Sequence, residues 1–310
     1  MLPQNQKLNV QCFVKECLSS SFLSEKDLKL LYVGKTSPVA SAYPRIMHAH
    51  PDFLEIVLIV SGTGEYFIHD KLCTVQAGDL LIYNAGIVHD EFAGTNVQIG
   101  SYCMAVSGLH LSGLRENALI PDSYGQVFHC GDEFEDISMM FEMMYRNLSQ
   151  PRLRAAVICD SLMRTVLEKV FAVTEHANHI ETTLPPQVYA LGIEIKTYID
   201  EHFGEPVTLQ SISEALSISS YYLSHIFKRM SGYSPFQYLI RRRIGEAQTL
   251  LIMTNLPIIR IVEMVGYETQ SYFNFHFTKY IGMPPKRFRR NFVVESAEQK
   301  PIETKQKICI

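Results

Sequence analysis

The sequence predicts an α+β protein of more than one domain, with a small β-barrel, two trailing helices, and an all-α domain containing two helix-turn-helix motifs. Three observations predict this fold class. Short apolar runs fill residues 40–111, helical apolar spacing follows in 134–175, and the last third repeats itself at an offset of 50 residues. At 310 residues the chain is long enough for two or three hydrophobic cores.

The predicted domain boundaries follow these changes of pattern. They place the barrel in 1–130, a helical segment in 131–175, a polar linker in 176–187, the all-α domain in 188–292 and a tail in 293–310.

The barrel is predicted from several strands at short, even spacing. The runs LEIVLIV, EYFIHD, KLCTVQ, DLLIYN and VQIGSYCMAV are separated by turn residues. Strands of this length and spacing are typical of a β-sandwich or barrel. In the helical segment that follows, Val157, Leu162, Val166 and Val170 recur at helical spacing.

The C-terminal repeat predicts a short helix, a tight turn and a longer helix in each copy. At the offset of 50, the matched pairs are Ile212 with Val262, Ser219 with Thr269, Tyr222 with Tyr272, Phe227 with Phe277, Gly232 with Gly282, and Pro235 with Pro285. We expect Ser219 and Thr269 to cap the two longer helices, because a hydroxyl can accept a hydrogen bond from the first free backbone N–H groups.

Each longer helix gathers its apolar side chains on one face and leaves the other face for contacts outside the domain. The outward residues are Ser219, Ser220, Tyr221, Ser224, His225, Lys228 and Arg229 in the first copy, and Gln270, Ser271, Asn274 and Lys279 in the second. Small, polar and basic side chains at this spacing suit the major groove of double-stranded DNA.

Charge supports contact with a polyanion. Residues 219–292 hold eleven Lys and Arg against three Glu, a net of +8 in a chain whose overall net charge is −4. The run SPFQYLIRRRIGEAQTLLIM predicts a connecting helix ~28 Å long, which approaches the ~34 Å between successive major-groove faces. We predict phosphate contacts for Arg241, Arg242 and Arg243, and for the RFRR stretch.

From residue 188 to 292 the sequence resembles the DNA-binding domain of the arabinose-regulator (AraC/XylS) family of bacterial transcription regulators. The resemblance is carried by Ala247, Leu250, Leu251, Gly266, Tyr267, Ser271, Tyr272, Phe273, Phe277, Gly282, Pro285 and Arg289. It implies that Tyr221, Ser224 and His225, with Gln270, Ser271, Asn274 and Phe275, face base edges. Phe275 and Thr278 depart from the family pattern, which usually has Arg and Lys there.

A histidine cluster is the candidate site of the barrel. In HAHPDFLEIVLIVSG, His48 and His50 lie two residues apart and point to one side if they share a strand, with Glu55 close behind. Together with His89 in GDLLIYNAGIVH, these residues resemble the two motifs of the cupin superfamily. Asn84 departs from that pattern, in which Pro is common.

Three interpretations of the cluster remain open. It can line an organic-ligand pocket, hold a divalent metal through His48, His50, Glu55 and His89, or only cap strands. The attachment to a tandem helix-turn-helix favours the ligand pocket without an obligatory metal, and the family resemblance implies an effector that is commonly a sugar. Arg45, Tyr66 and Tyr83 are further candidates to line it.

The sequence also limits the function classes. Walker-type, GxSxG and HExxH motifs are absent, the N-terminus lacks a secretory pattern, and the longest apolar run is far shorter than the ~20 residues of a membrane span. The seven cysteines form no CxxC and indicate reduced thiols in the cytoplasm.

We therefore expect no enzyme and no cofactor, but a homodimeric, ligand-responsive regulator of promoter DNA, joined through the helical segment, that contacts RNA polymerase if it activates. The alternative is a metal-dependent cupin enzyme, of isomerase or oxygenase type, with a basic helical appendage.

Overall fold

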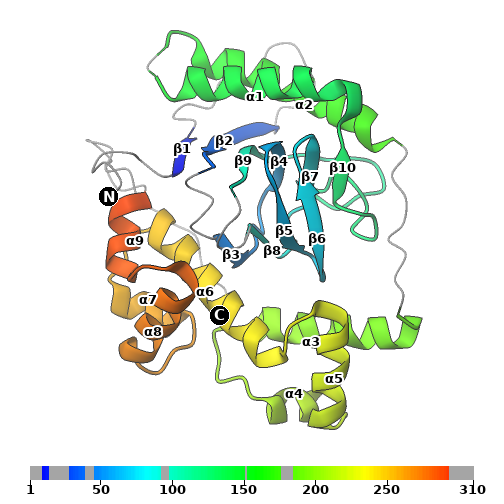
Figure 1. Cartoon of the computed structure of the whole chain (residues 1–310), viewed down its shortest axis with the longest axis vertical. Helices are drawn as coiled ribbons and strands as arrows, with labels where there is room; N and C mark the ends of the chain where they lie inside the picture. The colour runs from blue at the N-terminus through cyan, green and yellow to red at the C-terminus, as the bar shows by residue number, and fades with distance from the viewer. Residues whose placement is uncertain are drawn as a thin grey trace.

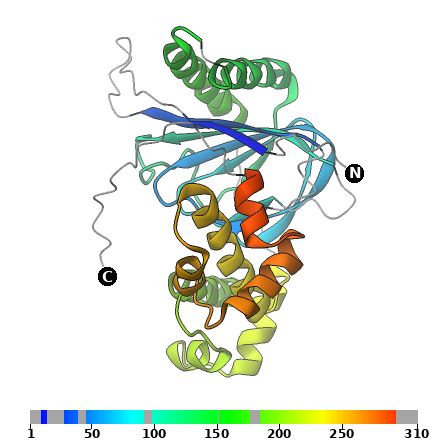
Figure 2. The ribbon, with the colours of Figure 1, turned by 90° about the vertical axis from the view of Figure 1, so that its left-hand side faces the viewer.

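The computed structural model describes residues 9–13, 28–38, 45–91, 98–150, 152–175 and 184–292. They form three layers stacked along the long axis of the molecule, with a helix pair at one end, β-sheets in the middle and a helical domain at the other end (Figures 1 and 2). The predicted fold class is confirmed. The predicted tail and most of the predicted linker lie outside the described residues.

Two antiparallel sheets make up the middle layer. One has the order β1 (Asn9–Phe13), β2 (Lys29–Thr36), β9 (Gly100–Ser107), β4 (Leu54–Ser61), β7 (Asp79–Tyr83) and β10 (Val127–His129). The other has the order β3 (Arg45–His48), β8 (His89–Glu91), β5 (Thr63–Ile68) and β6 (Lys71–Gln76).

Strand β4 shows why LEIVLIV is apolar at every position except Glu55, instead of alternating. Leu54, Ile56 and Leu58 pack toward the helix pair, whereas Val57 and Ile59 pack between the two sheets. A strand covered on both faces needs apolar side chains on both. Glu55 points to the inter-sheet side with Val57, so its carboxylate enters the barrel.

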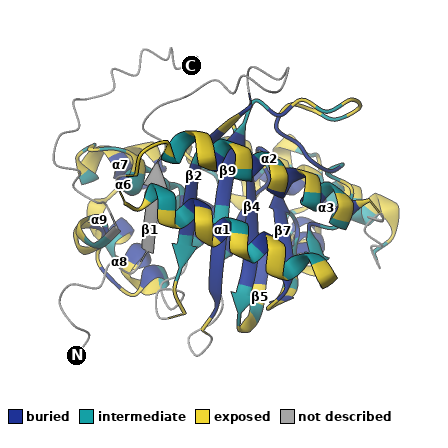
Figure 3. Ribbon diagram, turned by 90° about the horizontal axis from the view of Figure 1, so that it is seen from above, coloured by how far each residue is buried: buried dark blue, intermediate teal, exposed yellow. Residues whose placement is uncertain are grey.

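The helix pair consists of α1 (Phe134–Leu148), which follows a 3-10 turn at Gly131–Glu133, and α2 (Ala155–Thr174). Both helices lie across the outer face of the six-stranded sheet (Figure 3). Their buried residues include Ile137, Phe141 and Met163, none of which is measurably exposed. The two helices predicted after the barrel are confirmed.

The helical domain contains α3 (Pro186–His202), α4 (Leu209–Ala215), α5 (Ser220–Ser231), α6 (Pro235–Met253), α7 (Ile258–Met264), α8 (Gln270–Ile281) and α9 (Pro285–Phe292). Its two copies match the predicted repeat in structural detail. Ser219 accepts from the Tyr222 N–H and Thr269 from the Tyr272 N–H, so both predicted caps are confirmed. Gly232 and Gly282 close the two longer helices with φ of 78° and 79°.

Two local expectations were wrong. Strand β2 lies before the stretch predicted as the barrel's strands, yet it pairs with β9 and contributes buried Tyr32 and Val33. His50 is not on a strand with His48, because β3 ends at His48 and the chain turns before β4.

The helical domain docks directly on the four-stranded sheet. Ile46, Met47, Phe67 and Val88 of the sheet share one hydrophobic cluster with the helices. Helix α6 runs beneath β3 (Figure 1). Among the described residues, no helix has both the length and the hydropathy needed to cross a membrane.

Candidate functional site

The two longer helices of the repeat, α5 and α8, each bury one face and present the other. Leu223, Ile226 and Phe227 of α5 and Phe273 and Phe277 of α8 form the inner faces. The residues predicted to face DNA are all exposed or half-buried, and are Ser219, Ser220, Tyr221, Ser224, His225, Lys228, Arg229, Gln270, Ser271, Asn274, Phe275 and Lys279. Their contact with DNA stays a prediction.

The phosphate contacts predicted for Arg241 and Arg242 of α6 are wrong for this structure, because both guanidinium groups are engaged within the protein. Arg241 and Arg242 are buried and form ion pairs with Asp90 and Asp200 at 2.6 and 2.9 Å. Arg243 donates from Nε and Nη2 to the backbone carbonyls of Phe203 and Glu205. Arg241 and Arg242 thus join parts of the protein to each other, whereas Arg243 is half-buried and its phosphate contact stays a prediction.

In the barrel the structure brings the four predicted histidine-cluster residues together. One ligand atom from each of His48, His50, Glu55 and His89 lies within 4.8 Å of every other. Glu55 Oε2 is 3.4 Å from His50 Nε2 and 3.3 Å from His89 Nε2, while the Tyr32 hydroxyl donates to Oε1 at 2.6 Å. Strands β3, β4 and β8 and the turn after β3 supply these groups.

Backbone carbonyls fix the tautomers of two of these rings. His48 Nδ1 lies 3.1 Å from the Ile46 carbonyl and His89 Nδ1 lies 3.0 Å from that of Ile87. Because a carbonyl only accepts, each Nδ1 carries the proton. The Nε2 of His89 then points toward the Glu55 carboxylate, and neither Glu55 Oε2 nor His89 Nε2 has a hydrogen-bond partner among the described residues.

Burial controls the protonation of the cluster. It lowers the pKa of His48 well below its usual range, and it also lowers the pKa of His50, although the nearby Glu55 carboxylate opposes that shift. Burial opposes ionisation of Glu55, but His50 and His89 outweigh it and hold the pKa of the carboxyl well below its usual range. A carboxylate among imidazole lone pairs is complementary to a proton or a cation, so these donors fit a divalent metal.

The remaining predicted ligand residues separate into two groups. Tyr66 and Tyr83 are buried in the inter-sheet core, and the Tyr83 ring stacks on His89 with centroids 3.8 Å apart. Neither lines the large cavity beside the cluster, so for that cavity their prediction was wrong. Arg45 and His50 do line it, whereas His48, Glu55 and His89 lie buried behind.

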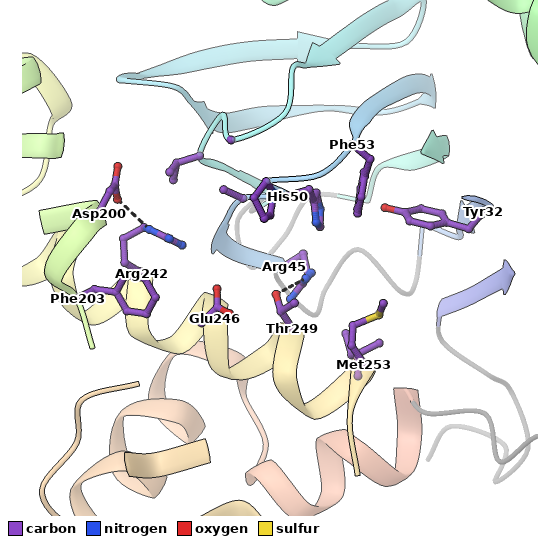
Figure 4. Close-up of a pocket in the computed structure, with 15 residues that line it drawn as sticks. Tyr32, Arg45, His50, Phe53, Asp200, Phe203, Arg242, Glu246, Thr249 and Met253 are labelled. Carbon is purple, nitrogen blue, oxygen red and sulfur yellow. Dashed lines mark hydrogen bonds and ion pairs between the residues drawn. The ribbon is translucent and has the colours of Figure 1, made fainter. Parts of the chain in front are cut away.

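That cavity, of about 430 Å³, lies between the barrel and the helical domain (Figure 4). Its barrel wall includes Tyr32, Arg45, Ala49, His50, Pro51, Phe53, Gly86 and Val88, and its helical wall includes Asp200, Phe203, Arg242, Glu246, Thr249, Ile252 and Met253. The sequence did not indicate that the helical wall lines a cavity. The amphipathic pattern of α6 predicts a helix, but it does not reveal which domain covers the second face of that helix.

Two family models match the chain. The AraC-like ligand binding domain matches residues 40–167, and the helix-turn-helix domain matches residues 212–291. The first range includes the histidine cluster, and the second includes helices α5 and α8.

Three curated relatives are similar to this chain. The uncharacterized HTH-type transcriptional regulator YdiP of Escherichia coli is 26% identical over 257 residues, or 81% of this chain and 83% of YdiP. The multiple antibiotic resistance protein MarA of Escherichia coli is 30% identical over 95 residues, or 31% of this chain and 75% of MarA. The lactose operon transcription activator of Staphylococcus xylosus is 20% identical over 265 residues, or 82% of this chain and 91% of that protein. The predicted family is thereby confirmed, and the chain belongs to the AraC family of ligand-binding, DNA-binding transcription regulators.

Proposed function

We propose that this regulator senses a small polar metabolite, a carbohydrate, and changes its binding to promoter DNA in response. The observation that carries the proposal is that β3, which ends at His48, also packs on α6. The Ile46 N–H donates to Gln248 at 2.9 Å, and Arg242 donates to the Met47 carbonyl at 3.0 Å. A ligand that displaces β3 therefore also displaces the helix joining the two helix-turn-helix motifs.

The carbohydrate part of the proposal has support from a relative. The lactose operon transcription activator of Staphylococcus xylosus aligns along most of both chains, and its name connects it with a sugar operon. We extend the proposal to activation through contact with RNA polymerase. Run-off transcription from the selected DNA site measures this, and an unchanged transcript level contradicts it.

DNA reading gives the central test. Selection of random duplexes with the full chain should return one preferred sequence. His225→Ala or Gln270→Ala should relax that preference locally, with a loss of about 1–3 kcal/mol per base contact. Lys228→Ala is the matched control, and should weaken all sequences alike and reduce the salt slope by about one. An unchanged preference in both recognition variants would refute the assignment of these helices.

We also propose a homodimer formed through the helix pair. Met139 and Met143 of α1 and Val157 and Ile158 of α2 are exposed although both helices bury another face. Exposed apolar side chains gathered on neighbouring helices favour a protein partner. Sedimentation of the full chain tests this, since a monomer at every concentration contradicts it.

A bound cation is the second candidate for the histidine cluster, because buried Glu55 Oε2 and His89 Nε2 lie close together with no hydrogen-bond partner among the described residues. We propose that the regulator needs no resident metal and that a proton satisfies the cluster. A metal held there by His48, His50, Glu55 and His89 would supply Lewis-acid chemistry. Elemental analysis of the purified chain should find well under one Fe, Mn, Ni or Zn per chain, whereas one per chain would favour the cation and revive the enzyme alternative.

A further inference from the structure

The cavity between the two domains contains a carboxylate and a guanidinium that do not pair with each other. Glu246 of α6 is half-buried and has no hydrogen bond or ion pair within the described residues. Arg45 donates only to uncharged groups there, namely Thr249 Oγ1 at 2.8 Å and the Gly245 carbonyl at 3.5 Å. Its guanidinium has five N–H donors, so several remain for a ligand. Figure 4 shows Arg45 lying against α6 beside Thr249, with Glu246 on the same helix.

The other charged pair of the cavity is already satisfied. Arg242 Nε donates to Asp200 Oδ1 at 2.9 Å. Asp200 also forms an ion pair with Lys196 and accepts a hydrogen bond from the Tyr238 hydroxyl. Two arginines and two acidic residues thus balance the charge of the lining. A charged ligand would break this balance, whereas an uncharged ligand keeps it.

The remaining lining combines apolar side chains, such as Phe53, Ile252 and Met253, with the polar side chains of Tyr32, His50 and Thr249. Phe53 stacks on His50 with ring centroids 4.3 Å apart and planes 19° apart, and both residues line the cavity. Aromatic and apolar side chains beside one donor group and one acceptor group are complementary to a sugar, because vicinal hydroxyls both donate and accept.

We propose that the effector binds in this cavity between Arg45 and Glu246, and that it is an uncharged mono- or disaccharide. This inference rests on the proposed function and adds that α6 of the DNA-binding domain supplies half of the effector site. His50 faces the cavity and lies 3.4 Å from Glu55, so the ligand also meets the histidine cluster. Ligand binding therefore links the barrel to α6, the helix that joins the two helix-turn-helix motifs.

The test uses the full chain and named probes. D-galactose, D-glucose, D-xylose, L-arabinose and lactose are screened by saturation-transfer NMR, and any that bind are titrated calorimetrically. Glu246→Gln should weaken the best sugar about tenfold or more, because it removes a charged acceptor. Glu201→Gln, an exposed carboxylate of α3 outside the cavity, is the matched control and should leave the Kd unchanged. Met253→Trp, which fills the cavity from an exposed position, should also abolish binding.

Each outcome decides the inference. A sugar that binds Glu246→Gln and Met253→Trp as tightly as the wild type places the effector elsewhere and overturns it. If no sugar binds, or D-glucuronate binds better than every neutral sugar, the assigned ligand class is wrong. If the same sample still binds DNA with sequence selectivity, the proposed regulator function stands although the proposed ligand class is wrong.

Discussion

Gly245→Ala should separate the sensor from the DNA-binding domain. In the middle of an exposed helix this change stabilises by about 1 kcal/mol, because alanine is the better helix former. At Gly245 the new Cβ would lie 1.9 Å from the Met47 carbonyl oxygen and 2.6 Å from that of Ile46. Both atoms are backbone of β3, so no side chain can rotate away. The strand must leave α6, and its hydrogen bonds to Gln248 and Arg242 are lost with it.

Hydrogen exchange at the Ile46 amide measures the separation directly. Overpacking costs about 1–3 kcal/mol before the lost hydrogen bonds are added, so exchange should accelerate at least tenfold. Gly125→Ala is the matched control, since nothing lies within 4 Å of its Cβ position, and it should change nothing at Ile46. Equal Ile46 exchange in Gly245→Ala and wild type would contradict the close approach of β3 to α6.

The features that the sequence could predict are those that depend on local patterns. The repeat of 50 residues could be predicted because caps, turns and apolar spacing are local, and Ser219 and Thr269 occupy the predicted N-cap positions. The histidine cluster was also readable, since its members fall in two recognisable motifs. The motif resemblance also predicted that the three histidines lie close to Glu55 inside the barrel, although His50 is not on a strand.

The failures have one physical cause. Arg241, Arg242 and Arg243 follow one another on a helix, so they point in three different directions. A basic run of this kind normally meets solvent or phosphate. Here Asp90 of the barrel pairs with Arg241, while Arg242 pairs with Asp200 of α3 and also donates to the Met47 carbonyl of the barrel. All three partners are distant from α6 in the sequence. No local pattern shows these contacts, and the helical wall of the cavity was missed for the same reason.

Asp90→Ala should be the most destabilising single change at the domain interface. Asp90 Oδ2 pairs with Arg241 Nη2 at 2.6 Å, and Oδ1 accepts the Phe67 N–H at 2.9 Å. Both Asp90 and Arg241 are buried, so alanine leaves a guanidinium and an amide without the carboxylate that compensates them. Breaking a buried pair in this way costs about 3–5 kcal/mol, and urea unfolding of the full chain should show it.

Arg241 is the reason to expect a partial rescue. Its guanidinium carbon lies 4.8 Å from the Tyr233 ring centroid and 5.8 Å from that of Tyr280, so the surroundings suit an apolar side chain of similar length. The double variant Asp90→Ala/Arg241→Met should therefore recover most of the lost stability, because the uncompensated charge is gone. Glu263→Ala, which breaks an exposed pair with Arg260, is the control and should stay within about 1 kcal/mol of wild type.

A double variant as unstable as Asp90→Ala would mean that the Phe67 amide, and not the guanidinium, dominates the cost. Full recovery would instead identify Asp90 as a group that specifies docking more than it stabilises the fold. Tyr233 follows α5 and Tyr280 lies in α8, so Arg241 joins the sensor to both helix-turn-helix motifs at one point. The Asp90–Arg241 pair therefore lies beside both helix-turn-helix motifs, where its loss would be felt by both.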